Sequence, residues 1–207
     1  DTIDINAASE HGVFVCNCPG RNSIAVAELA WGLILSCDRR IPDQVADLRA
    51  GVWSKKEYSK AKGLHGRTLG IVGLGQIGRE VAARGRAFGM RVIAWSPSLT
   101  EATAAEHGAE YSEFDPLMAT SDVVSVHVSL KPETRGLIDA RRISLMKPTA
   151  VLINTARGPV VDEQAMVVAL QEKRIAGAGL DVFDQEPIPA DHPLTRCPNT
   201  VLTPHMG

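Results

Sequence analysis

Three glycines stand at the spacing Gly-x-Gly-x-x-Gly, at positions 73, 75 and 78. A short apolar run from Leu69 to Val72 precedes them, and an amphipathic segment follows. In this strand–turn–helix context Gly73 permits a tight turn, Gly75 leaves room for a pyrophosphate, and Gly78 lets the helix lie close to the strand. The free N–H groups at the start of such a helix favour an anion. The motif predicts a dinucleotide-binding site, and the alternative is a turn with a purely structural role.

Polar residues follow the other predicted strands at the point where each strand ends. In a doubly wound sheet, ligands gather beyond the carboxyl ends of the strands, so these positions are candidates for binding or catalysis. The candidates are Ser96, His127, residues 154–158, residues 181–186 and His205. So many polar strand ends are unusual for a domain with a purely structural role.

Three of these residues, Arg157, Glu186 and His205, suit one reaction. An arginine binds a carboxylate through two parallel charge-assisted hydrogen bonds. A histidine carries a proton near neutral pH, and a carboxylate beside it favours the protonated form. The set fits reduction of a 2-oxo acid, in which a nicotinamide gives the hydride and His205 gives the proton.

Each member of this set also has a simpler interpretation when it is taken alone. Arg157 can pair with an acidic neighbour, Glu186 before Pro187 can be a turn residue, and a single histidine is commonly structural. The catalytic interpretation depends on all three lying together at one edge of the sheet.

Short apolar runs alternate with helical patterns along the chain, which predicts an α/β fold with a doubly wound parallel sheet covered on both faces. The predicted strands are 13–15, 69–72, 90–95, 123–126, 151–153, 178–182 and 200–202, and the predicted helices are 23–35, 43–50, 79–88, 113–119, 139–146 and 162–173. Residues 54–64 are polar and are expected to form a loop.

The composition is that of an ordinary globular protein. The chain has 207 residues, 44% of them hydrophobic, and a formal net charge of −2, so no basic surface for nucleic acid is indicated. No apolar run approaches the roughly 20 residues that span a bilayer. The four cysteines, at positions 16, 18, 37 and 197, are interpreted as buried reduced thiols of a cytoplasmic protein. A disulfide or a metal site is the alternative that is less favoured, and no metal ligand is predicted because no second cysteine pair or histidine cluster stands at metal-binding spacing.

The chain resembles the D-isomer-specific 2-hydroxyacid dehydrogenase family, which includes phosphoglycerate, glyoxylate and hydroxypyruvate enzymes. The matching blocks are the glycine motif, NTARGPVVDE at 154–163, GLDVFDQEP at 179–187 and TPHMG at 203–207. The resemblance implies a Rossmann-like domain, a homodimer, and a catalytic trio of Arg157, Glu186 and His205. It also implies that the dinucleotide is contacted by Gln76, Ile77, Thr155, Ala156, Arg157, Asp181 and His205, with Val128 nearby.

One departure from the family pattern bears on the cofactor. Members that use NAD have an acidic residue at the end of the second strand, where this chain has Ser96. Loss of the carboxylate that accepts both ribose hydroxyls costs NAD on the order of 1–3 kcal/mol. No arginine lies in residues 96–100 to bind a 2′-phosphate instead. The sequence therefore favours NAD, with NADP as the alternative.

The resemblance also indicates that most of a second lobe is absent. Relatives carry roughly 80–100 further residues ahead of this stretch, so we expect a fragment in which residues 1–19 belong to the substrate lobe and residues 20–207 form the NAD(P)-binding domain. The helix near 23–35 resembles the dimer-forming helix between the lobes. Two other functions are kept as alternatives: a dinucleotide-sensing module of the corepressor kind, and an inactive truncated NAD-binding domain.

Overall fold

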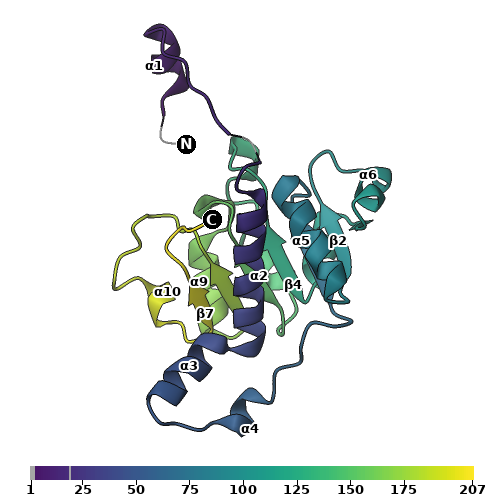
Figure 1. Cartoon of the computed structure of the whole chain (residues 1–207), viewed down its shortest axis with the longest axis vertical. Helices are drawn as coiled ribbons and strands as arrows, with labels where there is room; N and C mark the ends of the chain where they lie inside the picture. The colour runs from purple at the N-terminus through teal and green to yellow at the C-terminus, as the bar shows by residue number, and fades with distance from the viewer. Residues whose placement is uncertain (1–2, 19) are drawn as a thin grey trace.

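The computed structural model describes residues 3–18 and 20–207, and its centre is a seven-stranded parallel sheet in the order β3-β2-β1-β4-β5-β6-β7 (Figure 1). The strands are β1 (Thr68–Val72), β2 (Arg91–Trp95), β3 (Glu110–Tyr111), β4 (Val123–Val126), β5 (Val151–Asn154), β6 (Gly177–Leu180) and β7 (Thr200–Leu202). The strand order reverses between β1 and β4, so the carboxyl ends of these two strands mark the crevice in which such folds bind ligands.

Helices cover both faces of the sheet, which explains why the central strands are apolar on both sides. The helices are α1 (Ile5–Glu10), α2 (Ser23–Arg39), α3 (Ile41–Arg49), α4 (Lys55–Tyr58), α5 (Gln76–Ala87), α6 (Glu101–Glu106), α7 (Phe114–Thr120), α8 (Ala140–Leu145), α9 (Glu163–Gln171) and α10 (Pro193–Arg196). Two 3₁₀ turns lie at Pro132–Thr134 and Gly158–Val160. The predicted doubly wound α/β fold is confirmed.

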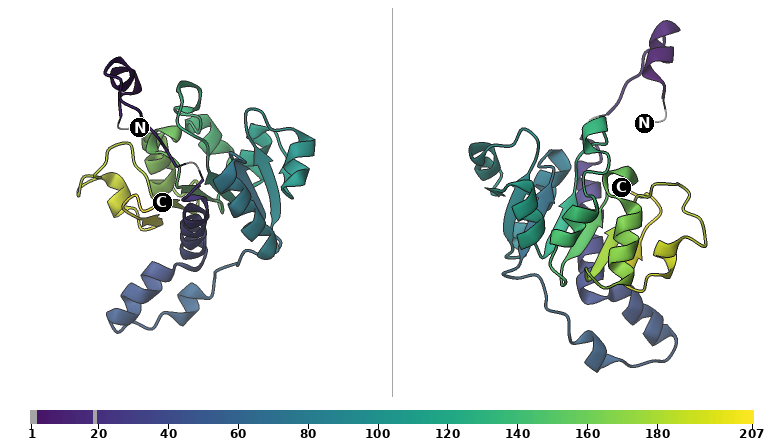
Figure 2. Two further views of the ribbon diagram at one scale, coloured as in Figure 1. Left: turned by 45° about the horizontal axis from the view of Figure 1, so that its top comes forward. Right: turned by 180° about the vertical axis from the view of Figure 1, so that it is seen from behind.

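Two hydrophobic clusters form the core, one on each face of the sheet. Leu69 and Ile71 of β1 pack with α2 and α5, whereas Val72 of the same strand packs with α7, α8 and α9. Alternate side chains of a strand point to opposite faces, so one short run supplies both clusters. Figure 2 shows the two helical layers with the sheet between them.

Two segments lie outside this core. Helix α1 and the extended residues that follow it stand away from the body, and α1 contributes no buried residue (Figures 1 and 2). Residues 41–67, called the arm below, carry α3 and α4 beneath the sheet and return to β1.

The structure corrects several predicted elements. Residues 13–15 are not a strand, because among the described residues they pair with no other strand, and Phe14 is 96% exposed. The arm contains the single turn α4 where only a loop is expected, and the short β3 and α6 are absent from the prediction. Residues 1, 2 and 19, which the sequence assigns to the substrate lobe, lie outside the described residues.

Among the described residues, no helix is long and apolar enough to cross a membrane. All four cysteines are free thiols, but Cys16 and Cys18 are exposed, contrary to the expectation that they are buried. The described residues contain no group of three or more His, Cys, Asp or Glu that could hold a metal ion.

Candidate active site

The glycine loop joins β1 to α5 with the geometry that its sequence predicts. Gly73 has a φ of 104°, and a Cβ there would lie 2.7 Å from the carbonyl carbon of His127. A Cβ at Gly78 would lie 2.1 Å from the carbonyl oxygen of Gly73, so only glycine allows α5 to approach the loop this closely. A Cβ at Gly75 would meet nothing within 4 Å, which leaves open space in front of the loop.

The loop and its neighbours fit the diphosphate of a dinucleotide. No side chain caps α5, so the N–H groups of its first turn face the open space beside Gly75. Beyond the end of β5, the buried Thr155 Oγ1 has no hydrogen-bond partner among the described residues. Uncapped amides and an unpartnered buried hydroxyl are groups that a bound phosphate or ribose satisfies.

The remaining predicted cofactor residues lie around this loop. Ser96 Oγ accepts a hydrogen bond from the Leu74 amide at 2.7 Å, which ties the end of β2 to the glycine loop. Gln76 Oε1 accepts a 3.4 Å hydrogen bond from Ser23 at the start of α2. Ile77 is partly buried against the α2 side of the core. These contacts hold the loop in shape from two sides.

Val128, Thr155 and Ala156 follow the central strands β4 and β5. Val128 and Thr155 are buried, and the Ala156 amide donates to Asn154 Oδ1 at 3.0 Å. Asn154 Nδ2 also donates to the carbonyl oxygen of Arg157 at 3.0 Å. The buried Asn154 amide therefore fixes the loop that carries Arg157.

Close backbone packing brings the Arg157 loop against the loop that carries Glu186. A Cβ at Gly158 would lie 2.1 Å from the carbonyl carbon of Phe183, so the two loops touch through their main chains. Phe183 in turn donates its amide to Glu186 Oε1 at 3.0 Å. Backbone contacts that the sequence does not reveal thus position Arg157 near Glu186.

His205 and Glu186 are in direct contact, 2.5 Å apart between Nδ1 and Oε2. Burial alone would raise the pKa of Glu186, but the hydrogen bonds from His205 and Phe183 and the positive charges of His205 and Arg157 lower it below its usual value. Both side chains are about one third exposed, so a small molecule can reach them. The structure therefore brings Arg157, Glu186 and His205 into one site at the carboxyl edge of the sheet.

Asp181 holds the segment that carries His205. Its carboxylate, fully buried just after β6, accepts hydrogen bonds from Thr203 Oγ1 at 2.6 Å, the Met206 amide at 2.9 Å and the Gly207 amide at 2.9 Å. The structure shows this anchoring role, and the contact of Asp181 with the dinucleotide stays a prediction.

Arg79, which is not among the predicted site residues, also lies at the glycine loop. Its Nε donates to the carbonyl oxygen of Leu74 at 3.2 Å. The sequence feature that could have indicated Arg79 is its position directly after Gly78, on a helix that begins at the candidate cofactor site.

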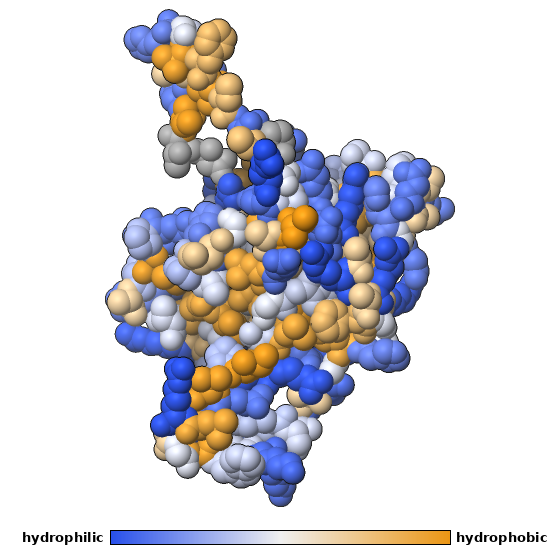
Figure 3. Space-filling model, in the orientation of Figure 1, coloured by the Kyte–Doolittle hydropathy of each residue, from blue (hydrophilic) through white to orange (hydrophobic). Residues whose placement is uncertain are grey.

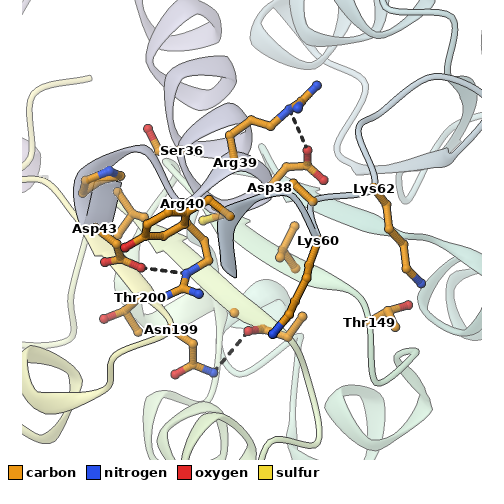
Figure 4. Close-up of a pocket in the computed structure, with 18 of the residues that line it drawn as sticks. Ser36, Asp38, Arg39, Arg40, Asp43, Lys60, Lys62, Thr149, Asn199 and Thr200 are labelled. Carbon is orange, nitrogen blue, oxygen red and sulfur yellow. Dashed lines mark hydrogen bonds and ion pairs between the residues drawn. The ribbon is translucent and has the colours of Figure 1, made fainter. Parts of the chain in front are cut away.

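A cavity of about 490 Å³ lies at the opposite, amino edge of the sheet, between the strands and the arm (Figure 4). Its lining includes the first residues of β4, β5, β6 and β7 and none of the predicted site residues. Charged groups in its wall pair with one another: Arg67 with Asp38 at 2.8 Å, and Arg40 with Asp43 at 2.8 Å. This cavity is separate from the candidate active site.

Comparison with known proteins assigns the chain to a family. Residues 31–207 match the family described as D-isomer specific 2-hydroxyacid dehydrogenase, NAD binding domain. The chain belongs to this family. It is 45% identical to the glyoxylate reductase of Thermococcus litoralis over 213 residues, which cover 100% of this chain and 64% of that protein. It is 43% identical to the D-3-phosphoglycerate dehydrogenase of Methanocaldococcus jannaschii over 208 residues, which cover 100% of this chain and 39% of that protein.

A solved structure of similar fold is an acyclic imino acid reductase in complex with NADPH and D-Arg. It is 35% identical to this chain with a TM-score of 0.88, and the match covers 99% of this chain and 64% of that one. The chain thus spans less than two thirds of the length of each of these relatives. The part that it represents is the NAD-binding domain of the D-2-hydroxyacid dehydrogenases.

Proposed function

We propose that this chain is the nucleotide-binding and catalytic part of an oxidoreductase that interconverts a D-2-hydroxy acid and its 2-oxo acid with NAD(H) or NADP(H). The observation that best supports this proposal is the contact of His205 with Glu186 beside the charge of Arg157. An imidazole, a carboxylate and a guanidinium at the edge next to a dinucleotide loop form a set suited to this reaction.

Each of the three residues has a separate task. Arg157 binds the substrate carboxylate and orients the neighbouring carbonyl group. His205 gives a proton to the carbonyl oxygen during reduction and takes it back from the hydroxyl during oxidation. Glu186 accepts a hydrogen bond from Nδ1 of His205, which fixes the ring with Nε2 available to the substrate.

The dinucleotide supplies the hydride when it is bound. Gly73, Gly75 and Gly78 form the turn against which its diphosphate would lie. The acyclic imino acid reductase was solved with NADPH, which supports keeping both cofactors in the proposal. The further residues proposed to contact the dinucleotide are Gln76, Ile77, Ser96, Val128, Thr155, Ala156, Arg157, Asp181 and His205.

We also propose that residues 1–19 belong to the substrate lobe and that residues 20–207 form the NAD(P)-binding domain. Apolar side chains in the first segment support this division, because Ile5, Val13 and Phe14 are exposed here and have no core of their own. A second lobe packed on them would bury these side chains and would form the other wall of the substrate cleft.

A homodimer in the cytoplasm is the proposed working form. Ile41, Val45 and Leu48 form an apolar stripe along α3 that is exposed in the single chain, and Trp53 beyond it is 79% exposed. Figure 3 shows apolar side chains gathered along this arm and on the face above it. A second copy of the chain is the proposed partner that covers them, and the free cysteines fit a reducing compartment.

The role assignment predicts the effect of two substitutions in the full-length protein. His205→Gln and Arg157→Ala are expected to lower turnover of glyoxylate, hydroxypyruvate, pyruvate or phosphohydroxypyruvate by about 10²- to 10⁴-fold, because the proton donor or the carboxylate clamp is lost. Dinucleotide affinity, measured by calorimetry, is expected to change only a few-fold. His65→Gln, at an exposed histidine, is the matched control.

Two results would contradict this proposal. If His205→Gln reduced these acids at the native rate, His205 would not be the proton donor. If the native protein bound NADH or NADPH but turned over none of the 2-oxo acids, a dinucleotide-sensing module would be the better description.

A further inference from the structure

The backbone of Leu74, in the glycine loop, makes hydrogen bonds with two polar side chains from different elements. Its amide donates to Ser96 Oγ at 2.7 Å, and its carbonyl oxygen accepts from Arg79 Nε at 3.2 Å. Ser96 follows β2, and Arg79 lies in the first turn of α5. Both side chains therefore lie against the same short stretch of the loop.

This stretch is where the adenosine ribose of a dinucleotide lies in a fold of this kind. The ribose is held between the glycine loop and the residue that ends the second strand, and an acidic residue there selects NAD by accepting both ribose hydroxyls. Ser96 has no carboxylate, and its hydroxyl is already bonded to the loop. A 2′-phosphate at this point meets no negative charge from Ser96.

Arg79 supplies the positive charge that residues 96–100 lack. It is exposed, and only its Nε is used in the contact with Leu74, so its two terminal nitrogens can donate to another group. Glu80, the adjacent acidic residue, is instead bonded by Arg84 at 2.6 Å. Among the described residues no carboxylate pairs with Arg79, so its charge is available to an anion.

The segment after Ser96 leaves space for such an anion. The Leu99 amide donates to the Ser96 carbonyl oxygen at 3.1 Å, which folds residues 96–99 into a tight turn. Pro97 and Ser98 are exposed on this turn. The Ser98 hydroxyl is therefore a second neutral donor at the rim of the same site.

We propose that Arg79 and Ser96 form a subsite for the 2′-phosphate, so that this domain binds NADPH at least as tightly as NADH. The inference rests on the proposed function, since it concerns the same dinucleotide site, and it reverses the preference for NAD that the sequence favours. The arginine comes from the helix after the glycine motif instead of from the loop after β2. A guanidinium suits this task because it donates two parallel charge-assisted hydrogen bonds to phosphate.

Equilibrium binding to the full chain tests this subsite without any turnover. Isothermal titration calorimetry with NADPH and with NADH is performed on the native chain, Arg79→Gln, Ser96→Asp and Arg86→Gln. Arg86 is the matched control, because it is an exposed arginine in the last turn of the same helix. Arg79→Gln is expected to weaken NADPH about tenfold and NADH less than twofold. Arg86→Gln is expected to change both affinities less than twofold.

Ser96→Asp gives an independent result in the opposite direction. A carboxylate at this position is expected to shift the affinity ratio towards NADH by at least about tenfold, because it accepts the ribose hydroxyls and repels the 2′-phosphate. The inference is overturned if the native chain binds NADH about tenfold more tightly than NADPH, or if Arg79→Gln weakens both cofactors equally or neither. If neither cofactor binds the native chain, the proposed function fails together with the inference.

Discussion

His127 directly follows strand β4, and its ring is enclosed by the protein. Its Nε2 is 2.8 Å from Ser125 Oγ, and its Nδ1 is buried without a partner among the described residues. The residue as a whole is partly exposed, but burial of the ring nitrogen lowers the pKa of His127 from 6.5 to about 4. Its carbonyl carbon also lies where a side chain at Gly73 would point, so the backbone of His127 helps to shape the glycine loop.

The shifted pKa of His127 predicts a pH dependence of stability. Between pH 6.5 and about 4 the unfolded chain takes up a proton at this residue and the folded chain does not. The free energy of unfolding therefore falls as the pH drops through this window, by at most about 3 kcal/mol for this residue. Urea titrations at pH 7 and pH 4.5 measure the loss.

A substitution separates the contribution of His127 to the pH dependence of stability from the contribution of the carboxylates. His127→Gln removes the titrating group, so its stability is expected to fall less between the two pH values than that of the native chain. His65→Gln, at an exposed position, is expected to lose as much as the native chain. An equal loss in the free energy of unfolding in all three proteins would contradict the assignment of this pH dependence to His127.

The elements that position the site differ in how far the sequence predicts them. The unit of β1, glycine loop, α5 and β2 is predicted well, because its apolar strands and glycine spacing are local signals. The direct contact of the Arg157 loop with Phe183 is a long-range backbone approach and leaves no periodic pattern. A strand at 13–15 is predicted wrongly, because strand propensity does not supply a partner strand. The short edge strand β3, only Glu110–Tyr111, is too brief to give a pattern.

The contact between the loops that carry Arg157 and Glu186 predicts that one added methyl group has a strong effect. Gly158→Ala would place a Cβ 2.1 Å from the Phe183 carbonyl carbon, a main-chain atom that cannot move cheaply. We expect a loss of about 1–3 kcal/mol in the free energy of unfolding and a fall in turnover of the full-length protein, since Arg157 and Glu186 move apart. Denaturant unfolding and steady-state kinetics measure the two effects.

Gly32→Ala is the control for this substitution. A Cβ at Gly32, within α2, would meet nothing within 4 Å, and alanine is the better helix former by about 0.5–1 kcal/mol. This variant is expected to keep or gain stability. Equal denaturant midpoints for the native chain and Gly158→Ala would show that the loops do not pack as described.

At the scale of the whole molecule, the sheet separates two regions with different roles. Its carboxyl edge carries the glycine loop, Arg157, Glu186 and His205, and its amino edge carries the arm and the paired charges of the cavity below it. The apolar stripe on α3 lies on the arm, away from the site. The sequence predicts α3, but the exposure of this stripe depends on how the arm leaves the body and follows only from the structure.

The stripe predicts that association of two copies depends on the arm. Leu48 is 58% exposed, so Leu48→Asp is expected to raise the dimer dissociation constant at least about tenfold in sedimentation velocity, because a charge would be buried at the interface. Ala46→Asp, on an exposed position away from the stripe, is the matched control. A native chain that sediments as a monomer at all concentrations would contradict the proposed homodimer.

The most direct test of the proposed site is a crystal structure of the chain with NADH or NADPH bound. The diphosphate is expected to lie against Gly75 and the first turn of α5, with the nicotinamide beside His205 and Arg157. A dinucleotide bound in the cavity under the arm, or bound to the glycine loop with its nicotinamide directed away from His205, would contradict this expectation.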